Sequence, residues 1–152
     1  MATADLRDIE AGAKPPGKKD DDRLSCVVVT PERTLFDELV DFVALPLYDG
    51  ELGVLPGRTP LIGRLGYGEL RTRVDGLTRR YFVDGGFVQV RDNIVTVLTG
   101  RAVPADQVDA HLASEELEHA RARRATTDAE QAEKEKAIAR ARAMLRVAAH
   151  RG

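Results

Sequence analysis

Three side chains suited to metal binding recur at four-residue intervals in the last third of the chain, at His111, Glu115 and His119. In a helix this spacing places them on one face, and imidazole and carboxylate groups are ligands that transition metals accept. The neighbouring residues are strongly charged, however, and no further protein ligand can be named from the sequence. A hydrated helix surface therefore explains the pattern better than a metal site does.

Other arrangements that could support catalysis are weak. The glycines at positions 63, 66 and 68 lack the spacing of a phosphate-binding loop. The carboxylates of the first half lie near turns, where hydrated side chains are the default, although a pair of glycosidase type stays open; they are Asp37, Glu38, Asp41, Asp49, Glu51 and Glu69. The single cysteine, Cys26, lies in an apolar run, which indicates a buried structural thiol rather than a nucleophile. We predict a protein that is not an enzyme and has no cofactor of its own.

The charges of the last 25 residues are strongly asymmetric. Acids dominate up to Glu135, at Asp128, Glu130, Glu133 and Glu135, and from Lys136 onward there is no acid, while Lys136, Arg140, Arg142, Arg146 and Arg151 carry a positive charge. Cations near the end of a helix offset its macrodipole, but this explains the last turn alone. The other interpretation is a basic helix that binds an acidic partner surface, and both remain open.

Size and composition limit the remaining possibilities. The chain has 152 residues, 32% of them charged, and lacks the run of about 20 apolar residues that crosses a bilayer. A net charge of −2 and an aromatic content of 5% do not favour nucleic-acid binding. Residues 1–22 combine Pro, Gly and charge around Lys14-Pro15-Pro16-Gly17, so we predict a disordered tail there.

Short strand-like segments fill residues 23–103. They cover residues 24–30, 33–37, 39–46, 70–74, 77–83, 87–91 and 94–99. Turn signals separate them: Pro56-Gly57, which predicts a type II turn, the hairpin pairs Asp75-Gly76 and Asp92-Asn93, and Asp84-Gly85-Gly86. Many short strands at close spacing predict an antiparallel β-sandwich or barrel.

Residues 104–152 have the composition of helices. We expect one helix from a cap at Asp106 to about Ala125 and a second from a cap at Asp128 to about Ala149. Their apolar stripes are narrow and rich in alanine; they consist of Val108, Leu112, Ala113, Leu117 and Ala120, and of Ile138, Ala141, Leu145 and Ala148. An antiparallel hairpin with such shallow contacts is marginally stable and could move, and a pair fixed to the sandwich is the alternative.

Several motifs in order resemble one known family. They are Thr30-Pro31-Glu32, the run from Gly50 to Leu61 that reads Gly-Glu-Leu-Gly-Val-Leu-Pro-Gly-Arg-Thr-Pro-Leu, Gly68-Glu69-Leu70-Arg71, Phe82-Val83-Asp84-Gly85-Gly86-Phe87-Val88-Gln89-Val90, and Val95-Thr96-Val97-Leu98. With the helical hairpin that follows, this order resembles the epsilon subunit of F-type ATP synthases. The resemblance implies a β-sandwich of about ten strands followed by a C-terminal α-helical hairpin.

The resemblance also implies a role in a rotor. The sandwich of this family links the gamma subunit to the c-ring of a proton-translocating enzyme, and the contact residues correspond to Glu51 and Arg58. Leu52, Val54 and Leu55 are expected to pack the sandwich. Such a subunit is peripheral, on the cytoplasmic face of a bacterial inner membrane, and meets the membrane only through the complex.

For the hairpin, the resemblance implies inhibition of ATP hydrolysis. The basic residues Lys136, Arg140, Arg142 and Arg146 would contact acidic segments of the catalytic beta subunits, beside alpha. Some members bind a regulatory ATP, which here would use Asp109, Arg142 and Arg146. Leu112 and Val103 replace two polar residues of that motif, so ATP binding is expected to be weak at most. The competing hypothesis is a stand-alone β-sandwich binding module with a helical interaction arm, although the chain has no Trp and three Tyr.

Overall fold

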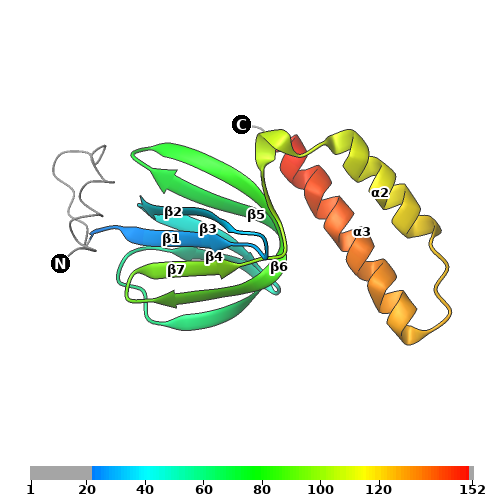
Figure 1. Cartoon of the computed structure of the whole chain (residues 1–152), viewed down its shortest axis with the longest axis horizontal. Coiled ribbons are helices and arrows are strands. Elements are labelled where there is room, and N and C mark those ends of the chain that lie inside the picture. The colour runs from blue at the N-terminus through cyan, green and yellow to red at the C-terminus, as the bar shows by residue number, and fades with distance from the viewer. Residues whose placement is uncertain (1–21, 151–152) are drawn as a thin grey trace.

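The computed structural model describes residues 22–150, which form a β-sandwich followed by a helical hairpin (Figure 1). The strands are β1 (Leu24–Val29), β2 (Thr34–Val40), β3 (Phe42–Leu47), β4 (Gly50–Val54), β5 (Leu61–Val74), β6 (Leu77–Arg91), β7 (Ile94–Leu98) and β8 (Ala102–Pro104). The helices are the 3₁₀ turn η3 (Ala105–Gln107), α2 (Ala110–Ala122) and α3 (Asp128–Ala149). The predicted fold class is confirmed. The predicted tail lies outside the described residues, except for Asp22.

The strands form one folded sheet in the order β2-β1-β7-β6-β5-β3-β4, with β8 paired to β6. Its pairs are antiparallel except β1 with β7, which run parallel. Eight strands take the place of the ten expected: β6, 15 residues long, joins the segments predicted at 77–83 and 87–91, and β5, 14 residues long, extends the segment predicted at 70–74 back to Leu61. The run from Gly50 to Val54, which belongs to none of the predicted strand segments, pairs with β3 as a strand.

Asp84-Gly85-Gly86 lies inside β6 rather than between two strands. Before this point the odd-numbered residues Tyr81 and Val83 face the main core, and after it the even-numbered Val88 and Val90 do. Gly86 has φ +109°, and a Cβ there would come within 1.9 Å of the carbonyl oxygen of Leu98. The sequence predicted a break between two strands at this point. Instead, glycine lets a single strand change which of its faces turns inward.

The other three predicted turns are confirmed. Asp75 and Gly76 have φ values of +52° and +81°, and Asp92 and Asn93 have +52° and +61°. Two consecutive positive values are what a type I′ hairpin turn requires. Gly57 follows Pro56 with φ +86°, as expected for the third position of a type II turn.

Alternating aliphatic residues fill the sandwich. Its fully buried members include Leu24, Val43, Leu45, Leu70 and Val95. Cys26 is also buried, as predicted, and burial together with the nearby Glu38 and Asp37 carboxylates raises the pKa of its thiol to about 12. Because of this raised pKa, the thiol stays protonated near neutral pH and does not form the thiolate that nucleophilic chemistry needs.

Both helix caps differ from those expected. Asp106 lies in η3, and Asp109 caps α2 by accepting hydrogen bonds from the amides of His111 and Leu112. Thr127, rather than Asp128, caps α3 by accepting from the amide of Glu130. Glu130 accepts in return from the Thr126 and Thr127 hydroxyls, which lowers the pKa of its carboxyl. Thr127 and Glu130 thus have the Thr-x-x-Glu spacing of a capping box.

Within residues 22–150, no helix is both long and apolar enough to span a membrane.

Candidate interaction surfaces of the sandwich and hairpin

The hairpin lies against one end of the sandwich, with α3 on β5 and β6 (Figure 1). A second apolar cluster fills this contact. Phe82 is its centre on β6 and is fully buried; the buried residues around it are Ala105, Val108, Ala113, Ala143, Met144, Val147 and Ala148. Because most of these side chains are small, the contact buries little apolar area per residue. The sequence left a movable and a docked hairpin open, and this structure contains the docked one.

Two polar contacts flank the apolar cluster. Arg140 of α3 places its Nε atom 2.8 Å from Oδ1 of Asp84, and its guanidinium lies 5.3 Å from the centre of the Tyr67 ring. The hydrogen bond to Asp84 raises the pKa of Arg140 above its ordinary value. At the end of α3, Nδ1 of His150 lies 3.0 Å from Glu69, whose other oxygen accepts from Arg80 at 3.1 Å.

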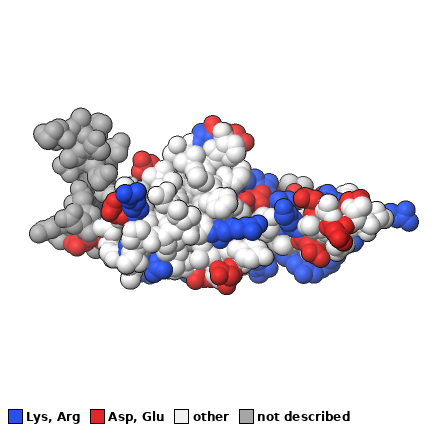
Figure 2. Space-filling view, turned by 90° about the horizontal axis from the view of Figure 1, so that it is seen from below, with Lys and Arg blue, Asp and Glu red and all other residues white. Residues whose placement is uncertain are grey.

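The four basic residues predicted to bind the beta subunits therefore have different environments. Arg142 and Arg146 are exposed to solvent, and Lys136 is exposed beside Glu133, with 3.7 Å between Nζ and Oε1. Arg140 alone is engaged with the sandwich. Figure 2 shows acidic and basic side chains gathered on the hairpin end of the molecule, whereas much of the sandwich on that face is uncharged.

The residues predicted to bind ATP have other surroundings as well. The Asp109 carboxylate holds two amides of its own helix at 2.9 and 3.1 Å, so its first role is that of a cap. Arg142 and Arg146 lie on α3 with exposed side chains. Leu112, expected in the apolar stripe of the first helix, is exposed, because α2 turns Ala113, Leu117 and Ala120 inward and Leu112 lies about 100° around the helix from Ala113.

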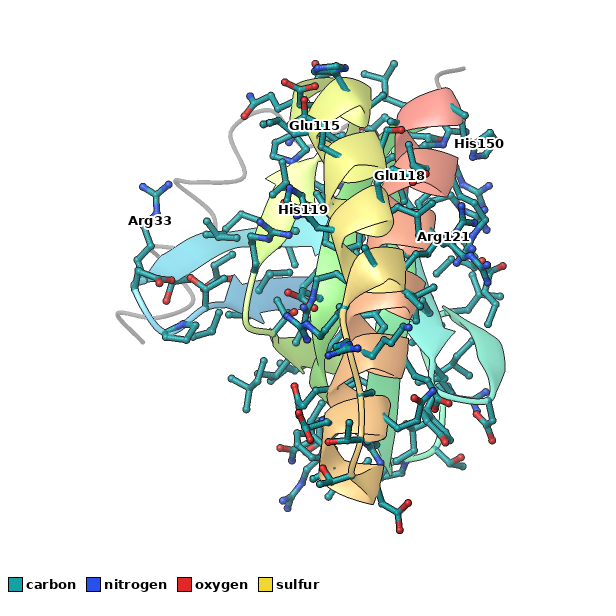
Figure 3. All side chains as sticks on the ribbon, turned by 90° about the vertical axis from the view of Figure 1, so that its right-hand side faces the viewer. Arg33, Glu115, Glu118, His119, Arg121 and His150 are labelled. Atoms are coloured by element: carbon teal, nitrogen blue, oxygen red, sulfur yellow. The ribbon has the colours of Figure 1, made fainter. Side chains whose placement is uncertain are left out.

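The histidines of α2 lie on its outer surface. His111 pairs with Glu115 at 2.9 Å, and Figure 3 places Glu115 and His119 along the exposed side of the helix. Among the described residues, no three histidine, cysteine or acidic side chains gather as metal ligands would.

Glu51 and Arg58 lie on β4 and on the connection to β5. Glu51 pairs with Arg71 of β5 at 3.1 Å, and Arg58 is exposed next to Gly57, whose amide donates to Asn93 at 2.8 Å. Leu52 and Val54 pack into the sandwich as expected. Leu55 does not: it is 58% exposed, because it follows the last residue of β4 and points out of the sheet before the turn.

An apolar surface that the sequence did not reveal lies on the outside of β5, β6 and β7. Its exposed members are Ile62 (78%), Phe87 (57%) and Leu98 (51%). Phe87 stands opposite Leu98 across one ladder and opposite Arg64 across the other. The sequence does contain a signal for this surface: Phe87 and Leu98 are each next to a valine, Val88 and Val97, that already fills an inward position. Large apolar residues at both parities of a strand indicate a second apolar face.

Comparisons with known proteins agree with this architecture. The model of the family described as ATP synthase, delta/epsilon chain, beta-sandwich domain matches residues 23–105. The ATP synthase epsilon chain of Rhodopirellula baltica is 54% identical over 123 residues, which are 81% of this chain and 96% of that one. The epsilon chain of Carboxydothermus hydrogenoformans is 43% identical over 67% of this chain and 76% of its own length.

Solved structures extend the likeness to the hairpin. A chain in the mitochondrial ATP synthase of Euglena gracilis, solved as OSCP, F1 and c-ring, has a TM-score of 0.75 and 26% identity over 90% of this chain and 87% of that chain. A chain of the Tetrahymena thermophila central stalk and c-ring has a TM-score of 0.66 at 16% identity, a likeness of fold. The chain therefore belongs to the delta/epsilon-chain family of ATP synthases.

Proposed function

We propose that this chain is the epsilon subunit of the central stalk of a proton-translocating F-type ATP synthase. It is a non-catalytic subunit whose sandwich links gamma to the c-ring and whose hairpin restrains ATP hydrolysis. Support comes from its epsilon-chain relatives and from the Euglena chain, which was solved together with F1 and a c-ring. It would reach the cytoplasmic face of a bacterial inner membrane only through this complex.

The observation that carries the stalk role is the apolar surface of Ile62, Phe87 and Leu98. Contiguous exposed apolar residues on a sheet mark a protein interface, since their burial contributes about 25 cal/mol per Å² of area removed from water. The hairpin already covers Phe82 on another part of the same sheet. We assign the uncovered surface to gamma, the partner that must hold the sandwich while the rotor turns.

The c-ring contact is assigned to the other predicted pair, Glu51 and Arg58. Tyr48, which directly follows β3, adds an exposed aromatic ring near Glu51. The guanidinium of Arg64 lies 4.9 Å from the centre of this ring. Charged and aromatic groups on short, paired strands suit contact with polar loops of a ring.

A binding assay tests the gamma assignment. Phe87→Glu places a charge in the apolar surface and should abolish capture of the gamma subunit of the same organism by the full chain. Leu77→Glu is the matched control, because Leu77 is 73% exposed but lies at the β5–β6 turn, and it should bind as the unmodified chain does. Equal capture by both variants would contradict the assignment.

The hairpin role is carried by the exposed Arg142 and Arg146. Both lie on a helix segment without acidic residues, which suits electrostatic pairing with an acidic surface of the beta subunits. A regulatory ATP would bind the hairpin only weakly, because Asp109 is already engaged as the cap of α2.

A further inference from the structure

Two carboxylates on the outer face of the sandwich each hold one basic side chain of α3. Asp84 of β6 and Glu69 of β5 are shielded, with side chains 16% and 14% exposed. Their partners, Arg140 and His150, come from the middle and the end of the same helix. The two contacts therefore fix both the position and the direction of α3.

The first contact is specific in its geometry. Arg140 combines a 2.8 Å ion pair to Asp84 with stacking on Tyr67, so one side chain meets residues of both β5 and β6. A charge-assisted hydrogen bond of this kind is stronger than a neutral one, and partial shielding from water strengthens it further. Arg142, two residues later, is exposed and takes no part in it.

The second contact depends on the charge of an imidazole. His150 is the C-cap residue of α3, and its amide donates to the carbonyl of Arg146. The ionisable groups around it are Glu69 of β5, Arg79, Arg80 and Tyr81 of β6, Asp106 of η3 and Arg146 of α3. Glu69 is the one in direct contact, and the helix terminus also favours a cation there. A protonated ring gives an ion pair, whereas a neutral ring leaves a hydrogen bond.

The apolar part of the docking surface is weak enough for these polar contacts to determine how much of the hairpin stays docked. Apart from Phe82, Met144 and Val147, it consists largely of alanine, whose burial contributes little. The free-energy difference between the docked and the undocked hairpin is then small enough for one shielded ion pair to change it measurably.

We infer that Asp84 and Glu69 form a two-point latch that holds the hairpin on the sandwich, with Arg140 bound at the first carboxylate and His150 at the second. The inference deepens the proposed regulation, because Arg140 cannot contact an acidic partner until it leaves Asp84.

The latch can be tested in the isolated full chain, without any partner. Spin labels on Gln89→Cys and Ala132→Cys, both exposed and on the sandwich and α3 respectively, report docking as a distance distribution. Asp84→Asn and Arg140→Ala should each raise the ratio of undocked to docked hairpin about tenfold, which corresponds to 1.4 kcal/mol. Arg142→Ala, the matched control, should leave the ratio unchanged. Circular dichroism establishes that each variant is folded.

The second point has its own readout. His150→Ala removes the contact with Glu69 and should raise the ratio of undocked to docked hairpin, whereas Arg146→Ala, exposed one turn earlier on α3, should leave it unchanged. Equal ratios for Arg140→Ala and Arg142→Ala would overturn the first point. Equal ratios for His150→Ala and Arg146→Ala would overturn the second. Because gamma and beta are absent, neither result bears on whether the chain binds them.

Discussion

At the scale of single residues, Cys26 has a thiol whose pKa the fold shifts strongly. Burial and two neighbouring carboxylates raise the pKa of its thiol from 9.0 to about 12. The folded state thus favours the neutral thiol, so this stabilisation is complete below pH 9 and is lost as pH rises toward 12. We predict that the free energy of unfolding falls over this range, and that Cys26→Ala, although less stable, shows a shallower fall. Urea unfolding at several pH values measures both, and equal slopes would contradict the prediction.

The sequence identified the burial of this thiol but not the contacts of Asp84 and Glu69. Cys26 lies among valines, and such a local pattern is sufficient to predict burial. The contact of Asp84 with Arg140 joins residues 56 positions apart and exists only once a helix docks on a sheet. No local spacing encodes it. Asp84 beside two glycines therefore indicated a turn.

At the scale of elements, Gly86 decides how β6 runs. A side chain there would meet the Leu98 carbonyl and would also have to adopt φ +109°. Gly86→Ala should cost about 3 kcal/mol of stability or more, from overpacking and backbone strain together. Gly76→Ala keeps the positive φ but has open space around it, and should cost about 1 kcal/mol. Chemical denaturation of the two variants compares them, and similar losses would show that the close approach does not matter.

The start of α3 supports a second matched pair. Thr127 accepts from the Glu130 amide, whereas Thr126 contacts only the Glu130 side chain. Thr127→Ala should cost about 1 kcal/mol and increase amide hydrogen exchange in the first turn of α3. Thr126→Ala should have a much smaller effect on both. Equal exchange in the two variants would assign the cap elsewhere.

The elements were predicted best where the pattern was local. Asp75-Gly76 and Asp92-Asn93 mark turns because residues with positive φ are rare and recognisable. The change of inward face at Gly85-Gly86 was missed, since a strand that switches face reads as two strands. Capping was misplaced at Asp106 and Asp128, where several suitable residues stand close together and only the path of the chain chooses between them.

At the scale of the whole molecule, the sandwich presents two different outer surfaces. The hairpin covers Phe82, and Ile62, Phe87 and Leu98 remain exposed. Family resemblance gave the architecture in advance, but it did not say which sheet face stays open or that Arg140 is held by Asp84. Under the proposed function, the open surface binds a permanent partner and the covered one forms a contact that changes.

The most direct test of the account is the rate of ATP hydrolysis by the assembled enzyme that contains Arg142→Glu with Arg146→Glu. Both side chains are exposed and outside the latch, so the chain should still fold, dock and assemble. Reversing their charge should repel an acidic surface of the catalytic head, and hydrolysis should rise several-fold. Arg123→Glu with Arg124→Glu, exposed in the connection between the helices, is the control and should leave the rate unchanged. An unchanged rate in the first variant, with assembly intact, would contradict regulation by the hairpin.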